Sequence, residues 1–387
     1  MTGAAALAEA IRRVDPSPHR DYVLGSLALI SGRREEAERL LVGAYELGDA
    51  GTEPRLVADI AGQLANLCLT RGKGGETAMW AARALDCGQG MSLLSTALTC
   101  RVIGLAFAGR VAEGLAAVAS LPDAPAELDL ISADGYLGRG YAHYITDDLA
   151  GACADLVPIA ALFRRRGPAY LAVAALQTLS WVEYRLGTWD DAILHGGLAA
   201  SIGEDTDQSW LLSSAHLGAC APLAARGEWE AAQLHADAAC AAAAVVGLEF
   251  ASTGFAAMAV AHIARARGDH AGVVRALEVL LPLETVEVLG EPGILGWQEL
   301  YAEALVNLGR LDAAESVLVP HEELAAARDR RSAMAGAARV RGTLESARGR
   351  RDAAAAAFAF GLEQLEGLEM PFERALTELE YGGLLRR

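Results

Sequence analysis

The stretch Gly187-Thr188-Trp189-Asp190-Asp191-Ala192 is followed forty residues later by Gly227-Glu228-Trp229-Glu230-Ala231-Ala232. Both stretches contain a glycine, a polar or acidic run, and an alanine five positions after the glycine. A glycine closes a helix because it readily adopts left-handed backbone angles, and acidic residues favour the start of the next helix. The alanine lets the two helices cross closely. Each stretch therefore predicts the turn of a helical hairpin.

The same turn recurs along the whole chain. Its anchor residues, 37 to 41 positions apart, are Gly32, Gly72, Gly109, Asp147, Gly187, Gly227, Gly268, Gly309 and Gly349. A period near 40 is typical of α-solenoids, in which each repeat is one helical hairpin stacked on the next. We therefore predict an all-α, right-handed solenoid of about nine hairpins that forms a single domain over residues 1–387.

Composition agrees with this fold. The 387 residues include 81 alanines, the best helix former, and only 12 prolines. The formal net charge of −17 makes direct binding of nucleic acid unexpected. No apolar run reaches the roughly 20 residues of a membrane span, and the N-terminus lacks the order of a secretory signal. We therefore predict a cytoplasmic protein without a membrane segment.

The sequence contains no catalytic or metal-binding motif. The six cysteines stand far apart with no CxxC, and the eight histidines are spread about one per repeat. H-E-x-x-H, G-x-S-x-G and the phosphate-binding G-x-x-x-x-G-K-[ST] are all absent. We therefore predict a protein that is not an enzyme, with no cofactor, no metal and reduced, mostly buried thiols.

Three shorter signals concern the connections between helices. Gly290-Glu291-Pro292-Gly293 predicts a turn inside the array. The basic runs Arg164-Arg165-Arg166 and Arg328-Asp329-Arg330-Arg331 are predicted to end helices, where the helix dipole favours positive charge. None of the three marks a domain boundary.

The spacing resembles the tetratricopeptide repeat, although that unit is usually about 34 residues long. Within this class, the segments 27–41 and 338–349 resemble the helical sensor region of the large ATP-binding, LuxR-type (MalT-like) transcription regulators. The stretch Met370-Pro371-Phe372-Glu373-Arg374-Ala375 is similar to a helix that this family often has shortly before its DNA-binding domain.

The resemblance implies a ligand-sensing domain of a regulator, with adjoining ATPase and helix-turn-helix domains in the parent protein. Neither domain has its motif in this sequence, and the last helix, residues 372–386, is half of a tenth hairpin. We therefore expect a piece of a longer polypeptide that can form a homo-oligomer. The alternative is a structural scaffold that holds protein partners and binds no small molecule.

The resemblance also locates a binding face. In tetratricopeptide hairpins the first helix lines the concave groove, and positions ten, six and three before each anchor are expected to project there. The predicted ligand-binding residues are Tyr141, Tyr144, Trp181 and Tyr184, with Gln177 and Asp134 close by and Phe255 and His262 extending the groove beside Trp210, Met258, Glu299 and Glu303.

Aromatic faces bordered by hydrogen-bonding groups suit a sugar-like or heteroaromatic effector. A protein partner on the same groove is the other possibility. A register slip of one residue would instead make Tyr144 and Tyr184 packing residues, so core packing is the alternative to a ligand pocket.

Overall fold

The computed structural model describes residues 9–30, 33–87, 96–123, 128–163, 169–247, 251–283 and 286–386. Within these ranges the regular structure is helical, with no strand. The chain divides into two compact units, and the boundary falls inside helix α8, between Arg139 and Gly140.

Unit 1 is an array of helical hairpins. Its helices are α2 (Pro18–Ile30), α3 (Arg34–Leu47), α4 (Pro54–Thr70), α5 (Gly74–Asp86), α6 (Ala97–Phe107), α7 (Val111–Ala117) and the first part of α8 (Leu130–Ile145).

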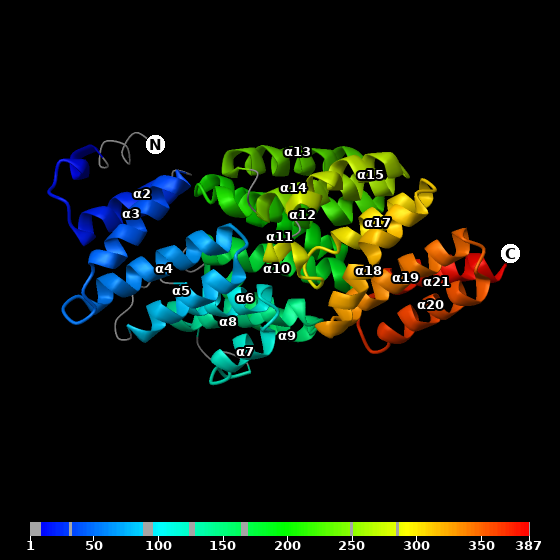
Figure 1. Ribbon diagram of the computed structural model, residues 1–387, viewed down its shortest axis with the longest axis horizontal. Helices are drawn as coiled ribbons and strands as arrows, with labels where there is room; N and C mark the ends of the chain where they lie inside the picture. The colour runs from blue at the N-terminus through cyan, green and yellow to red at the C-terminus, as the bar shows by residue number, and fades with distance from the viewer. Residues whose placement is uncertain are drawn as a thin grey trace. The chain divides into compact units, whose positions relative to one another are not determined.

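Unit 2 continues the same architecture over about twice the length. Its helices are the end of α8, α9 (Leu149–Phe163), α10 (Ala169–Leu186), α11 (Trp189–Asp205), α12 (Ser209–Arg226), α13 (Trp229–Val246), α14 (Ala251–Ala266), α15 (His270–Leu277), the 3-10 helix η1 (Glu278–Leu283), α16 (Glu287–Gly290), α17 (Trp297–Asn307), α18 (Leu311–Ala327), α19 (Arg331–Ala347), α20 (Arg351–Gln364) and α21 (Pro371–Leu385). Helices α12, α13 and α14 lie side by side in Figure 1.

The hairpin turns form as predicted. Every anchor in the described ranges has a positive φ: Gly72 (69°), Gly109 (77°), Asp147 (66°), Gly187 (80°), Gly227 (84°), Gly268 (70°), Gly309 (73°) and Gly349 (76°). At α12 the amide of Glu228 donates to the carbonyl of Leu223, which closes the last turn of the helix. The anchor Gly32 and the run 164–166 lie outside the described residues.

The position five residues after each anchor is buried and mostly small. Ala152, Ala192, Ala232, Ala314 and Ala354 are each 0% exposed. The all-α array of hairpins predicted from this pattern is therefore confirmed within the described ranges.

A second small residue, seven positions before the anchor, faces the other helix of its own hairpin. A Cβ on Gly140 of α8 would lie 2.7 Å from Leu156 of α9, and one on Gly342 of α19 would lie 2.8 Å from the ring of Phe358 of α20. The absent side chains therefore set how closely the two helices of a hairpin approach.

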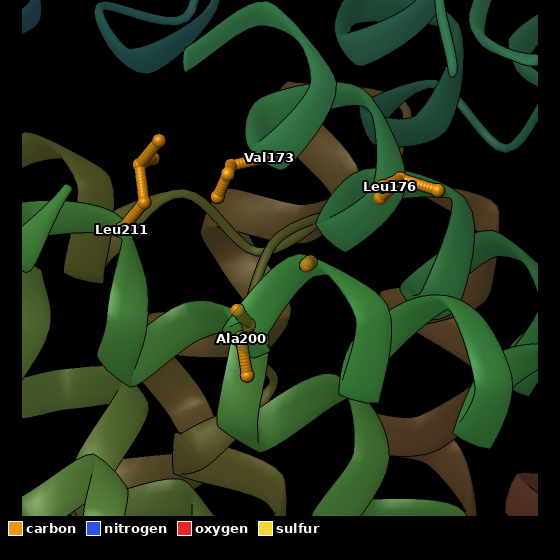
Figure 2. Packing of buried hydrophobic residues seen from close by; sticks show 6 residues of the cluster. Val173, Leu176, Ala200 and Leu211 are labelled. Carbon is orange, nitrogen blue, oxygen red and sulfur yellow. The ribbon is translucent and has the colours of Figure 1, made fainter. Parts of the chain in front are cut away.

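Between hairpins, aliphatic residues fill the space that the alanines leave. Figure 2 shows Val173 and Leu176 of α10 gathered with Ala200 of α11 and Leu211 of α12. All four are at most 3% exposed, and Trp210 packs against them from the side. Trp210 is therefore a packing residue at this helix junction.

The regular pattern is interrupted after α14. Helix α15 has only eight residues, and it is followed by η1 with Pro282 inside it, then by the short α16. Proline lacks the amide hydrogen that a continuing helix needs. The segment Glu291–Gly296, here called the inner loop, then leads into α17.

Candidate functional site

Unit 2 contains a pocket of about 180 Å³, here called the chamber. Seven of the residues expected to line a groove line this chamber: Tyr144, Trp181, Tyr184, Met258, His262, Glu299 and Glu303. The counting rule of ten, six and three positions before the anchor therefore identifies the inward face of the first helices. The ligand-binding role of these residues stays a prediction.

The inner loop forms one wall of the chamber. The Tyr144 hydroxyl donates to the carbonyl of Ile294 at 3.2 Å, and Arg185 Nη2 donates to the carbonyl of Gly293 at 2.8 Å. A Cβ on Gly293 would lie 2.5 Å from the Ile145 carbonyl, so only glycine permits this approach. The turn predicted at residues 290–293 is thus a tertiary contact as well as a connection.

Helix α21 forms another wall. Phe372 meets the ring of Trp189 at 5.1 Å between centroids and that of Tyr184 at 6.2 Å. Pro371 packs against the turn at Gly187. The inner loop and α21 therefore line the chamber together with the first helices of these hairpins.

The inner loop is held by a buried charge pair. The Glu291 side chain, fully buried, accepts from Arg330 Nε at 2.7 Å and is bonded to Arg328. The basic run at 328–331 does follow the end of α18, as predicted. Its function in the structure is nevertheless to neutralise Glu291.

A second charge network crosses the chamber wall. Glu303 accepts two hydrogen bonds from Arg265, at 3.1 and 2.9 Å, and one from Arg339 at 2.5 Å, while Arg339 also binds Glu380 at 2.6 Å. Burial would raise the pKa of Glu303, but the two guanidinium groups outweigh it and lower the pKa to about 2. Glu303 is therefore a carboxylate over the ordinary pH range.

The other charges at the chamber also have partners. Arg185 pairs with Asp147 at 3.3 Å and lies 4.3 Å from the centre of the Tyr144 ring. Glu299 lies 3.0 Å from Nε2 of the buried His321 and is pressed against the backbone at Gly336. These contacts hold the polar wall in one arrangement.

Three lining groups differ from the rest because no hydrogen bond to the described residues satisfies them. Glu373 Oε2 is buried without a partner. The rings of His262 and Tyr184 meet edge-on at 6.0 Å between centroids, and among the described residues neither the His262 imidazole nor the Tyr184 hydroxyl makes a hydrogen bond. Burial, with Arg265 nearby, lowers the pKa of His262 to about 4, so its ring is neutral at pH 7.

The predicted aromatic residues do come together. Trp181 lies 6.4 Å from Tyr141, 5.8 Å from Tyr144 and 5.3 Å from Phe255 between ring centroids. Its indole N–H donates to the Ser214 carbonyl at 3.3 Å. Trp181 and Tyr141 are only 7% and 6% exposed, so this cluster is also part of the core.

Tyr141, Phe255, Gln177 and Asp134 do not line the chamber. Gln177 accepts a hydrogen bond from the Ser214 hydroxyl and is 7% exposed. Asp134 belongs to unit 1, where its carboxylate accepts from the amides of Leu98 and Thr99 in the first turn of α6. Asp134 therefore satisfies a helix end, although burial raises its pKa to about 6.

Sequence reasoning missed Arg185, Arg265, Arg339 and Glu373. Arg265 stands three residues before Gly268 and Arg339 ten before Gly349, so the same counting rule identifies both once charged residues are considered. Arg185 and Glu373 have no such signal, because their position depends on how the inner loop and α21 fold back.

The described residues contain no group of three or more histidine, cysteine or acidic side chains placed to hold a metal ion. All six cysteines are free thiols. Among the helices that the structure describes, none combines the length and the apolar character needed to cross a bilayer.

Comparison with solved structures finds 55 similar chains, among them the following two. The crystal structure of yeast Tom70 has a TM-score of 0.32 and 12% identity, over 98% of this chain and 96% of that chain. The crystal structure of the P58(IPK) TPR domain has a TM-score of 0.27 and 13% identity, over 95% and 98%. No protein-family model and no curated protein sequence matches the chain.

Proposed function

We propose that this chain is a non-catalytic interaction scaffold of the helical-repeat class. The supporting observation is a set of exposed leucines on the second helices of two successive hairpins. Leu194 and Leu198 of α11 are 61% and 45% exposed, and Leu234 of α13 is 73% exposed. We call these three residues the outer leucines. Exposed apolar groups that recur at one position of a repeat suit a protein partner.

The repeat register places two of the outer leucines equivalently. Leu194 and Leu234 each stand seven residues after their anchors, Gly187 and Gly227. The segment 187–247 contains eight acidic residues and one basic residue, Arg226. Charge complementarity therefore favours a partner segment that is amphipathic, with apolar residues on one face and Lys or Arg beside them.

A fluorescent amphipathic helix of about 18 residues made of Leu and Lys tests this function in an anisotropy titration. We expect saturable binding that weakens with salt and falls about tenfold or more when Leu194 and Leu234 are both replaced by Ser. Leu47→Ser is the matched control, because Leu47 is 67% exposed on α3, outside the outer leucines. Equal binding by the double variant, or by a scrambled peptide, would contradict the proposal.

A second candidate is the sensor region of a LuxR-type regulator, with an effector held in unit 2. The chamber supports this reading, because it combines aromatic walls with hydrogen-bonding groups that the described residues leave unsatisfied. In that case the parent protein also carries a nucleotide-binding and a helix-turn-helix domain. Calorimetry of the chain against a metabolite panel separates the two candidates, since a pure scaffold binds no small molecule.

A further inference from the structure

We propose that the chamber of unit 2 binds a small organic ammonium compound, with the charged head on Glu373 and an apolar body against Trp181 and Met258. This inference rests on the second function proposed above and names its ligand class.

Glu373 carries a hydrogen-bond acceptor that no described residue satisfies. It stands in the first turn of α21, where the helix dipole favours an acidic residue. Yet Oε2 is buried and has no hydrogen-bond donor among the described residues. A buried carboxylate oxygen without a donor is costly, and a ligand N–H group removes that cost.

The arginines around Glu373 already form ion pairs with other carboxylates. Arg185 pairs with Asp147, Arg265 with Glu303, and Arg339 with Glu303 and Glu380. An anionic ligand would therefore have to displace a carboxylate that is already bound. A cation would not.

The charge balance points the same way. Counting the chamber-lining groups and the carboxylates bound to them, three arginines face five carboxylates: Asp147, Glu299, Glu303, Glu373 and Glu380. The site therefore has two more negative than positive charges before His321 is counted. A ligand with one positive charge reduces this imbalance.

The lining of the chamber also includes apolar and aromatic side chains. Trp181, Tyr184 and Tyr144 contribute ring surface, and Met258 and Leu217 contribute aliphatic surface. Aromatic faces attract ammonium groups, and they accept a flat or aliphatic body equally well. At roughly 10–15 Å³ for each water, a volume of about 180 Å³ holds about a dozen waters, or a ligand of about ten non-hydrogen atoms.

Three probes of nearly equal size test the proposal: phenethylamine, phenethyl alcohol and phenylacetate. We expect calorimetry on the full chain at pH 7 to show that phenethylamine binds at least about tenfold more tightly than the other two probes. Only its ammonium head group forms an ion pair with a carboxylate. Glu373→Gln should remove that preference, since it keeps the shape of the side chain and removes its charge.

Glu378→Gln is the matched control. Glu378 lies one and a half turns further along α21 in an exposed pair with Arg374 at 3.5 Å, and its change should leave phenethylamine binding intact. If Glu373→Gln fails to fold, Met258→Phe serves instead, because it narrows the chamber without altering a charge and should abolish binding of phenethylamine.

The outcomes separate this inference from the sensor function. Tighter binding of phenylacetate or phenethyl alcohol would overturn the ammonium proposal and leave a ligand-binding chamber standing. Undiminished binding of phenethylamine to Glu373→Gln would overturn the role of Glu373. No binding of any probe, together with no binding in the metabolite panel, would overturn both proposals.

Discussion

The Tyr144 hydroxyl and the Ile294 carbonyl form a buried hydrogen bond of 3.2 Å across 150 positions of sequence. This bond joins the first helix of one hairpin to the inner loop, and it lies at the edge of the chamber. It is the clearest sign that unit 2 closes on itself.

Tyr144→Phe should destabilise unit 2 by about 1–2 kcal/mol, because the Ile294 carbonyl is then left buried without its donor. Chemical denaturation followed by tryptophan fluorescence measures the change. Tyr45→Phe is the control: the Tyr45 hydroxyl makes no hydrogen bond to the described residues, and its ring contact with Trp80 at 4.9 Å is retained. Equal losses of stability in the two variants would show that the hydrogen bond of the Tyr144 hydroxyl does not stabilise unit 2.

Gly293→Ala should displace the inner loop, because the new methyl group would meet the Ile145 carbonyl at 2.5 Å. We expect the free energy of unfolding to fall by about 1–3 kcal/mol and amide hydrogen exchange in the inner loop to become faster. Gly197→Ala in α11 has open space around its Cβ and should be neutral or stabilising by up to about 1 kcal/mol. Unchanged exchange at residues 291–296 in the Gly293 variant would count against the tight approach.

Glu303→Gln should cost about 2–4 kcal/mol at pH 7, because Arg265 and Arg339 lose a shared buried carboxylate. The lowered pKa of Glu303 determines how its contribution to stability changes with pH. Stability from Glu303 is complete above its unfolded pKa of about 4.5 and is lost as the pH falls towards about 2. Urea midpoints at pH 7 and pH 3 should therefore differ less in the variant than in the parent chain.

His262 should make unit 2 sensitive to mild acid. Its pKa is lowered to about 4, so the neutral ring stabilises the fold above the unfolded value of about 6.5, and this contribution is lost as the pH falls towards 4. Between pH 7 and pH 5 the loss from this residue is about 2 kcal/mol. His262→Gln should lose correspondingly less stability over that interval, and urea unfolding at pH 7 and pH 5 measures the difference.

The thiols should react in the order of their exposure. Cys240 is exposed, whereas burial raises the pKa of Cys68, Cys100 and Cys220 to about 12. Iodoacetamide at pH 8 should therefore modify Cys240 first and reach the other three only after unfolding. Mass spectrometry of the labelled peptides measures the order, and early labelling of Cys220 would contradict the burial.

The local pattern of the sequence was sufficient for the helical hairpins. Gly227 closes α12 with left-handed angles, and Ala232 packs in α13 at 0% exposure. Both effects act over a few residues, so spacing alone reveals them. The same spacing identified the inward positions of Trp181 and Tyr184, because side chains three or four residues apart share one face of a helix.

What only the tertiary structure decided is the closure of the chamber. The inner loop reaches Tyr144 and Arg185 through contacts that span more than a hundred residues, and α21 brings Glu373 to the chamber. Such contacts depend on the sum of small rotations between successive hairpins, which no single repeat encodes. The sequence therefore determined which residues face inward, and the accumulated curvature of the array decided which of them meet.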